Sequence, residues 1–366
     1  MNKQLRWIPA IAVPALVVAG AIAVPAMATA SVNLPHKSAA QIVALAQKSG
    51  GSSFSGTVEQ TANLGLPDLS SLQGGSGDSG SVSDIVSQLS GTHKARVFAS
   101  GSTKSRIQTL DQLSERDVIR NGDSVWAYDS SSKKAVHATI PSSGGRSLPS
   151  AVPSSPTDIA DQVLAQIDDY TTVTTSSNVR VAGQKAYQIT LTPKNDTTTL
   201  VGDVTLAVDA STGIPLRAAI TAAGQTDPAY SVAFTSIDYS TPSASTFAFT
   251  PPKGTAVKTI TAPTSASSSK RFVHPGAVSR EDGVAKSEAE PTVTGTGWST
   301  VVGLTLPAGD TSALSGSQAG MLDQVTTAVA GGRLLQTSLV SVLLTDDGHV
   351  YVGAVKPSAL EAAAGE

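Results

Sequence analysis

The chain has 366 residues, of which 40% are hydrophobic and only 14% charged, so one large or two ordinary domains are expected. The net charge of −3 gives no basic surplus, so no nucleic-acid partner is expected. Cysteine is absent, which excludes disulfides, thiolate metal ligands, a cysteine nucleophile and a lipid-modified N-terminal cysteine.

The first thirty residues predict export. Lys3 and Arg6 precede a run without charge from Trp7 to Ala30, which ends in two small-x-small cleavage patterns. An uncleaved anchor is the alternative, because about 20 apolar residues can span a bilayer. Prolines within the run disfavour a long straight helix. We therefore expect residues 1–30 to be a signal peptide or an anchor, and the body to be extracytoplasmic, either secreted or membrane-associated.

Two helices are predicted in the body. Ser38-Ala39-Ala40-Gln41 reads as a capping box that opens a helix to Lys48. Ser155-Pro156 predicts the start of a second helix reaching residue 168, because serine caps helices and proline favours their first position. Residues 63–82 are rich in Gly and Ser and predict a loop, followed by a short helix through residue 89.

The rest of the body reads as strands joined by hairpin turns, of which Asn121-Gly122 is the clearest because both residues tolerate positive φ. Strands are expected at 54–58, 94–99, 105–110, 116–120, 124–128, 134–140, 178–182, 186–192, 201–209, 214–221, 230–239 and 246–249. A meander this long must curl, so we predict an α+β fold with a strongly curved antiparallel sheet and helices in its hollow.

The composition changes at 257–291, which predicts a linker before a small C-terminal α/β module at 292–366. The module begins with a segment at 296–306 that contains Trp298, and it is expected to hold strands at 334–345 and 350–355 and a helix at 318–330. The turn Asp346-Asp347-Gly348 joins the last two strands, and Ser358 caps a final short helix.

The chain carries little that indicates catalysis. Gly77-Asp78-Ser79-Gly80 matches the surroundings of some serine nucleophiles, but it lies in a low-complexity Gly/Ser stretch with no base nearby. The five histidines are scattered and no carboxylate cluster accompanies them, so no metal site is expected. We predict no catalytic residue, no cofactor and no enzyme activity.

The segment KSRIQTLDQLSERDVIRNGDSVWAYDSSSKKAVH resembles the LolA/RseB-like superfamily of extracytoplasmic lipoprotein carriers and sigma factor regulators. Its Val125-Trp126-Ala127-Tyr128 strand is similar to the family's "lW-Y" strand, and residues 247–254, FAFTPPKG, resemble the "F-F-P-P-G" ending. The resemblance covers about residues 38 to 256, and residues 332–355 look like extensions of actinobacterial members. The basic residue and proline that often precede the "F-x-W" strand are replaced by Gly101-Ser102-Thr103.

The resemblance implies an unclosed, roughly eleven-stranded half-barrel at 31–256 whose helices plug an apolar cavity for acyl chains. Trp126 and Tyr128 share one face of their strand, and they either pack as ordinary core or line that cavity. The full set of cavity candidates is Phe54, Val58, Val97, Ile107, Val118, Trp126, Tyr128, Val136 and Ile189.

Three functions remain open. The first is a non-enzymatic carrier that binds lipid acyl chains or lipoprotein. The second is a regulator resembling RseB, which binds the outer part of a membrane-anchored anti-sigma factor. The third is a serine hydrolase, which rests only on the string at 77–80.

Overall fold

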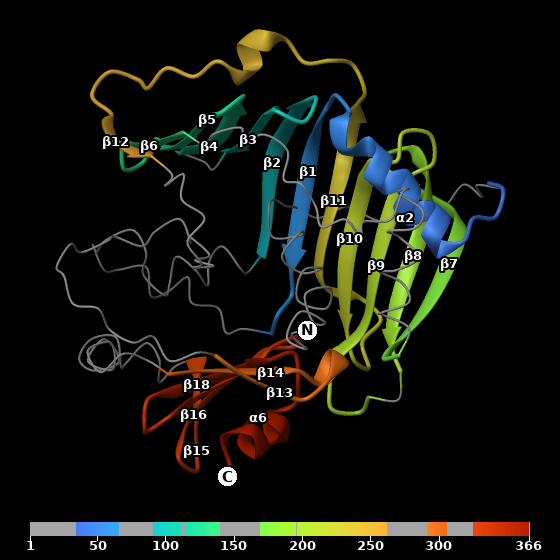
Figure 1. Ribbon diagram of the computed structural model, residues 1–366, viewed down its shortest axis with the longest axis vertical. Coiled ribbons are helices and arrows are strands. Elements are labelled where there is room, and N and C mark those ends of the chain that lie inside the picture. Colours follow the sequence, from blue (N-terminus) through green and yellow to red (C-terminus); the bar gives the residue numbers. More distant parts are fainter. Residues whose placement is uncertain are drawn as a thin grey trace, which may run out of the picture.

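The computed structural model describes residues 34–65, 91–110, 114–139, 169–194, 196–261, 291–305 and 325–365. These residues form a large curved sheet of twelve strands and a separate six-stranded sheet (Figure 1). The expected short helix at 81–89 and the helix at 156–168 lie outside the described residues. No helix among the described residues is long and apolar enough to cross a membrane.

The large sheet confirms the predicted unclosed, mainly antiparallel architecture. Its order is β12-β6-β5-β4-β3-β2-β1-β11-β10-β9-β8-β7. The strands are β1 Phe54–Ala62, β2 Gly91–Ser100, β3 Lys104–Leu110, β4 Glu115–Asn121, β5 Ser124–Asp129, β6 Lys134–Thr139, β7 Thr171–Val181, β8 Gln184–Pro193, β9 Val201–Asp209, β10 Pro215–Ala222, β11 Pro228–Asp238 and β12 Ala256–Thr261. Only β12 runs parallel to its neighbour, β6, so residues 257–261 belong to the sheet rather than to a linker.

Helix α2, Ala39–Lys48, confirms the predicted capping box. The Ser38 hydroxyl accepts a hydrogen bond from the Gln41 amide, and the Gln41 side chain accepts one from the Ser38 amide. A short 3-10 turn, η2 Ser49–Gly51, follows it. Ile42 is fully buried against Tyr187, Ile189 and other residues of β8 and β9. We call the side of the sheet that α2 covers the helix face.

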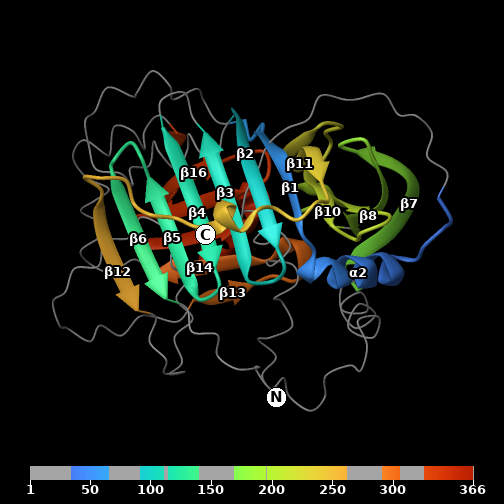
Figure 2. The same cartoon turned by 90° about the horizontal axis from the view of Figure 1, so that it is seen from above.

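Residues 239–255, which we call the strap, cross the opposite side of the sheet. We call that side the strap face. The strap leaves β11, passes over β2 to β5 and enters β12 at the far edge (Figure 2). It holds η4, Ala244–Phe247, where a strand was predicted at 246–249. That prediction was wrong because the alternation of Phe247 and Phe249 places aromatic anchors on the sheet surface rather than pairing the backbone.

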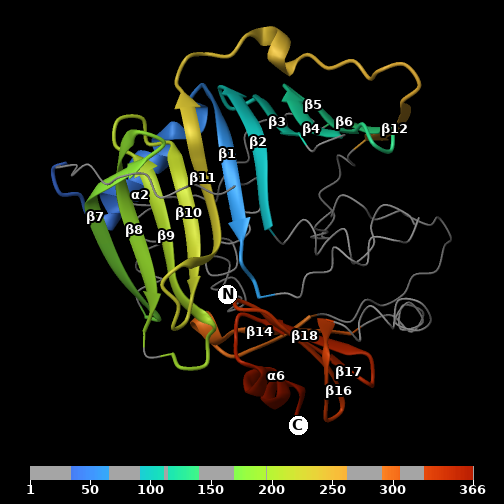
Figure 3. The same cartoon turned by 180° about the vertical axis from the view of Figure 1, so that it is seen from behind.

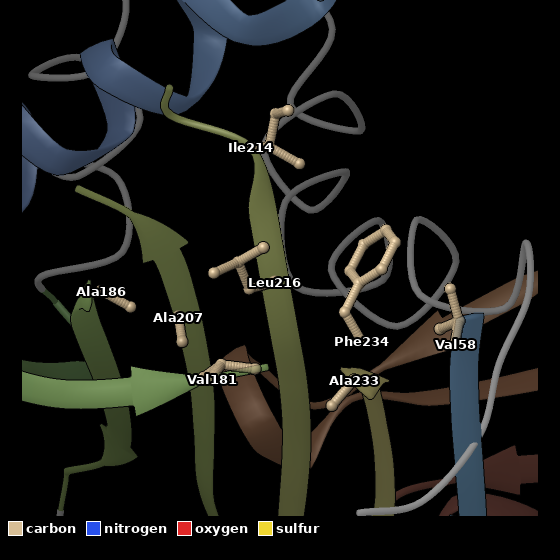
Figure 4. Packing of buried hydrophobic residues seen from close by; sticks show 8 residues of the cluster. All are labelled: Val58, Val181, Ala186, Ala207, Ile214, Leu216, Ala233 and Phe234. Atoms are coloured by element: carbon tan, nitrogen blue, oxygen red, sulfur yellow. The ribbon is translucent and has the colours of Figure 1, made fainter. Parts of the chain in front are cut away.

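A core of small and branched residues fills the β1 and β7–β11 half of the sheet. It contains Val58, Val181, Ala186, Ala207, Ile214, Leu216, Ala233 and Phe234 (Figure 4). Gly56 has a specific role here, because a Cβ at this position would lie 2.8 Å from the Phe234 ring and 2.4 Å from the Ser236 carbonyl oxygen. The ring of Phe234 therefore packs across the β1 backbone.

The second sheet has the order β13-β14-β18-β17-β16-β15. Its elements are β13 Thr292–Thr294, η5 Gly297–Ser299, β14 Val301–Thr305, β15 Thr327–Val329, β16 Gly332–Gln336, β17 Ser341–Thr345, β18 His349–Gly353 and α6 Pro357–Ala364. Leu343, Val355 and Leu360 form its core with no exposure. Two predictions were wrong: residues 327–329 are a strand rather than helix, and 334–345 is broken by a turn at residues 337–340.

The second sheet lies at one end of the large sheet (Figure 3), and the two are joined by a packed interface. Leu339 is 6% exposed and lies among Ala222, Ala229 and other residues of the large sheet. The Trp298 indole donates a hydrogen bond to the Thr171 hydroxyl at 2.9 Å. Because apolar packing and hydrogen bonds both cross the interface, the second module is held in one position relative to the large sheet.

Candidate ligand-binding surface

The strand registers place an apolar row on the helix face. Val97 pairs with Ile107, Ile107 with Val118, Val118 with Ala127, and Ala127 with Val136. Directly paired residues of antiparallel strands point to the same side of the sheet. The five side chains, which we call the apolar row, therefore cross β2 to β6 over about 19 Å, four strand spacings of about 4.8 Å.

The apolar row is open in its middle. Val118 has 49% of its surface exposed, although it is a branched aliphatic residue in a central strand. Ile260 of β12, which pairs with Ala138, lies on the same face and is 44% exposed. Sequence reasoning missed Ile260 because it lies in the segment that reads as a linker.

Basic side chains flank the apolar row. Arg116 and Arg120 lie two residues on either side of Val118 in β4 and so project from the same face. Lys258 pairs with Val136 and continues the row onto β12. An apolar surface with cations at its margins is suited to a ligand that has an acyl chain and an anionic group.

Three further candidates lie on the helix face but are not part of the apolar row. Phe54 pairs with Ala99, which lies two residues from Val97, and its ring meets the Phe234 ring edge-on at 5.8 Å. Val58 is 4% exposed and belongs to the buried core. Ile189 is covered by α2. These residues support the surface from beneath or beside it.

Trp126 and Tyr128 project from the other side of the sheet. Trp126 pairs with Ile119, and Tyr128 with Asp117, whereas Val118 pairs with Ala127. The two rings lie beneath the strap, with the Phe249 ring 5.4 Å from the Trp126 ring and 5.5 Å from the Tyr128 ring. The aromatic pair thus packs against the "F-F-P-P-G" segment, on the face opposite the other seven candidates.

Charged residues help to fix the strap. Asp117 is 2% exposed and accepts two hydrogen bonds from Arg106, at 2.6 and 3.1 Å. Arg106 also donates to the Thr246 carbonyl oxygen of the strap at 3.3 Å. Burial raises the pKa of Asp117 above its ordinary value, and the Arg106 guanidinium opposes that rise. The pair therefore connects β3 and β4 to η4.

The described residues do not form a site that supports the serine-hydrolase hypothesis. Ser79 lies outside the described residues. The Ser124 hydroxyl lies 2.8 Å from Nε2 of His137, whose ring stacks on Trp126 at 4.2 Å. In the described part of the chain His137 has no hydrogen bond to a carboxylate, and no group of three His, Cys, Asp or Glu residues could hold a metal ion.

Comparison with known proteins gives one family. Residues 82–253 match the family model "MucB/RseB N-terminal domain". This match supports the predicted resemblance to the LolA/RseB-like superfamily. The matched residues run from before β2 into the strap, and they include the apolar row and both anchoring phenylalanines. No curated protein matches the chain.

Similar solved structures include the MucA/MucB complex of Pseudomonas aeruginosa, at 17% identity and a TM-score of 0.43, covering 88% of this chain and 96% of that one. An uncharacterized conserved protein from Thermus thermophilus has 12% identity and a TM-score of 0.35, covering 61% and 100%. A LolA superfamily protein from Nitrosomonas europaea has 15% identity and a TM-score of 0.22, covering 58% and 99%. Similarities at this level carry no argument about what this protein binds.

Proposed function

We propose that this protein is an extracytoplasmic, non-enzymatic binding protein whose apolar row takes up acyl chains of a lipid or lipoprotein. The observation that carries the proposal is the half-exposed Val118 at the centre of five paired apolar residues. The charge-free segment from Trp7 to Ala30 supports export of the body, residues 31–366.

The energetics suit reversible uptake. Each buried methylene contributes about 0.8 kcal/mol, so about 14 methylenes contribute roughly 11 kcal/mol when fully buried. Association costs about 4 to 15 kcal/mol in lost freedom. When the cost lies at the low end of this range, binding is favoured by up to about 7 kcal/mol, which is a reversible affinity and requires no catalytic group.

The test compares two valine substitutions in residues 31–366, each purified from the protein's own envelope. Val118→Asp places a carboxylate in the apolar row, and Val293→Asp is the control because Val293 is also a strand valine, 48% exposed. Native mass spectrometry followed by lipid extraction should find a stoichiometric acyl-bearing ligand on the wild type and on Val293→Asp, but not on Val118→Asp. Equal ligand on all three proteins, or none on any, contradicts the proposal.

The second candidate is a regulator of the RseB type that binds the extracytoplasmic part of a membrane-anchored regulatory protein, such as an anti-sigma factor. It is favoured by the MucB/RseB family match together with a second module packed firmly on the large sheet. Cross-linking in intact cells followed by mass spectrometry should then identify one membrane-anchored protein. If Val118→Asp abolishes acyl binding and the cross-link persists, partner binding does not use the apolar row.

A further inference from the structure

An open pocket lies on the strap face, where β11, β1 and β2 are neighbours. Its volume is about 370 Å³, which is within the range of small-molecule sites. Its strap-face lining consists of Ser55, Thr57, Arg96, Phe98, Ser236 and Asp238. The pocket begins where the strap leaves β11, and it is on the opposite side of the sheet from the apolar row.

The registers arrange these six side chains in two short rows. Ser55 pairs with Asp238 and Thr57 with Ser236 across β1 and β11. Since Phe54 pairs with Ala99, the same register sets Phe98 opposite Ser55 and Arg96 opposite Thr57. One row thus carries a carboxylate, a hydroxyl and an aromatic ring, and the other carries two hydroxyls and a guanidinium.

The polar groups of the pocket have unused hydrogen-bonding capacity. Neighbouring cations are paired, since Arg106 binds Asp117 and Lys94 binds Glu59. The Arg96 side chain, in contrast, makes no hydrogen bond or ion pair within the described residues. The hydroxyl groups of the pocket also make no hydrogen bond within these ranges. Hydrogen bonds from Ser240 lower the pKa of Asp238, so this carboxylate is ionised at neutral pH.

We propose that this pocket binds a small zwitterion, with Arg96 holding an oxyanion and Asp238 an ammonium group. Thr57 and Ser236 donate hydroxyl hydrogen bonds beside Arg96, so the oxyanion has several donors. The two charged residues stand two strands apart, about 10 Å, and are offset by two residues, about 7 Å, along the strands. About 12 Å therefore separates their backbones, and their side chains reduce that gap to the size of a small molecule. The Phe98 ring covers the methylenes between the ligand's charges.

Two kinds of molecule carry an oxyanion and an ammonium group close together: a phosphoethanolamine headgroup and a free amino acid. The experiment titrates the full chain with phosphoethanolamine and with glycine by ligand-observed NMR. Inorganic phosphate and ethanolamine are titrated separately as half-ligands. The variants are Arg96→Gln and Asp238→Asn, with Arg180→Gln as the control because Arg180 is an exposed arginine on β7, remote from the pocket in the strand order.

Removal of one charge-assisted contact should weaken zwitterion binding about ten- to a hundredfold in each pocket variant and leave Arg180→Gln unchanged. If either zwitterion binds more tightly than its half-ligands, the site is supported. The zwitterion with the higher affinity then identifies which of the two classes of ligand the pocket takes. The proposal is overturned if neither zwitterion binds, if Arg96→Gln binds like wild type, or if inorganic phosphate binds as tightly as phosphoethanolamine. Val118→Asp should leave this binding intact, so the outcome is separate from that for the acyl site.

Discussion

Replacement of Phe249 by alanine tests whether the strap is a structural anchor or the cover of a ligand cavity. Phe249 contacts both Trp126 and Tyr128, with ring centroids 5.4 and 5.5 Å apart. Each aromatic contact contributes about 0.5–1.5 kcal/mol beyond buried area, and loss of a half-buried phenylalanine removes about 1 kcal/mol of burial. Phe249→Ala should therefore lower the free energy of unfolding by about 2–4 kcal/mol.

The assay is urea unfolding of residues 31–366, followed by circular dichroism and by tryptophan emission. At slopes of about 2–3 kcal/mol per molar urea, the midpoint should fall by about 1 M. Trp126 emission should shift to the red in native buffer, because the ring loses its cover. Ala248→Ser is the matched control, since Ala248 is the exposed neighbour in the same strap.

The cavity reading of the aromatic pair gives a different result. If Trp126 and Tyr128 line the acyl site, Phe249→Ala alters the amount of bound acyl ligand. On the strap-anchor reading, acyl binding is unchanged and only stability falls. A variant as stable as Ala248→Ser that has lost its acyl ligand refutes the assignment of the two rings to the strap face.

Three further outcomes are expected. Leu339→Ala should lower the free energy of unfolding by about 2–4 kcal/mol, because it removes a buried side chain from the interface between the two modules. Calorimetry should then show two melting transitions where the wild type has one. Ser38→Ala should lower stability by about 1 kcal/mol in urea unfolding, because α2 loses its capping hydrogen bond. Burial of Asp209 opposes its ionisation, but hydrogen bonds from Ser211, Tyr239 and Thr212 outweigh burial and lower its pKa below 3.8. Its contribution to stability is thus complete above pH 3.8 and is lost as the pH falls through the folded pKa; Asp209→Asn should flatten that acid limb of the stability curve.

Most of the large sheet could be predicted because its hairpins are encoded locally. The alternation around Asn121-Gly122 sets β4 and β5 within a residue or two of the observed bounds. The same hairpin also shows which face Trp126 occupies. A two-residue turn at either Asn121-Gly122 or Gly122-Asp123 pairs even positions with odd ones, so Trp126 shares a face with Ile119 and not with Val118.

The missed elements depend on contacts between distant segments. β12 forms because the strap carries it to the free edge of β6, and its own sequence reads as linker. The turn that separates β16 from β17 has no Gly or Asn. Thr337 builds it by accepting a hydrogen bond from the Val340 amide at 2.8 Å, and burial of Leu339 in the other module holds it. Neither condition is visible in a short sequence window.

The division of residues between the two faces has a consequence for the proposed acyl site. The aromatic anchors Trp126 and Phe249 are used to hold the strap, so the apolar row is aliphatic and has no polar group at its centre. The affinity of such a surface depends on how much hydrocarbon contacts it and not on the polar groups of the ligand. Each added methylene in contact strengthens binding about fourfold. Selectivity among lipids must therefore come from polar groups at the margins of the row, where Arg116, Arg120 and Lys258 lie, and from the length of chain that about 19 Å of row can cover.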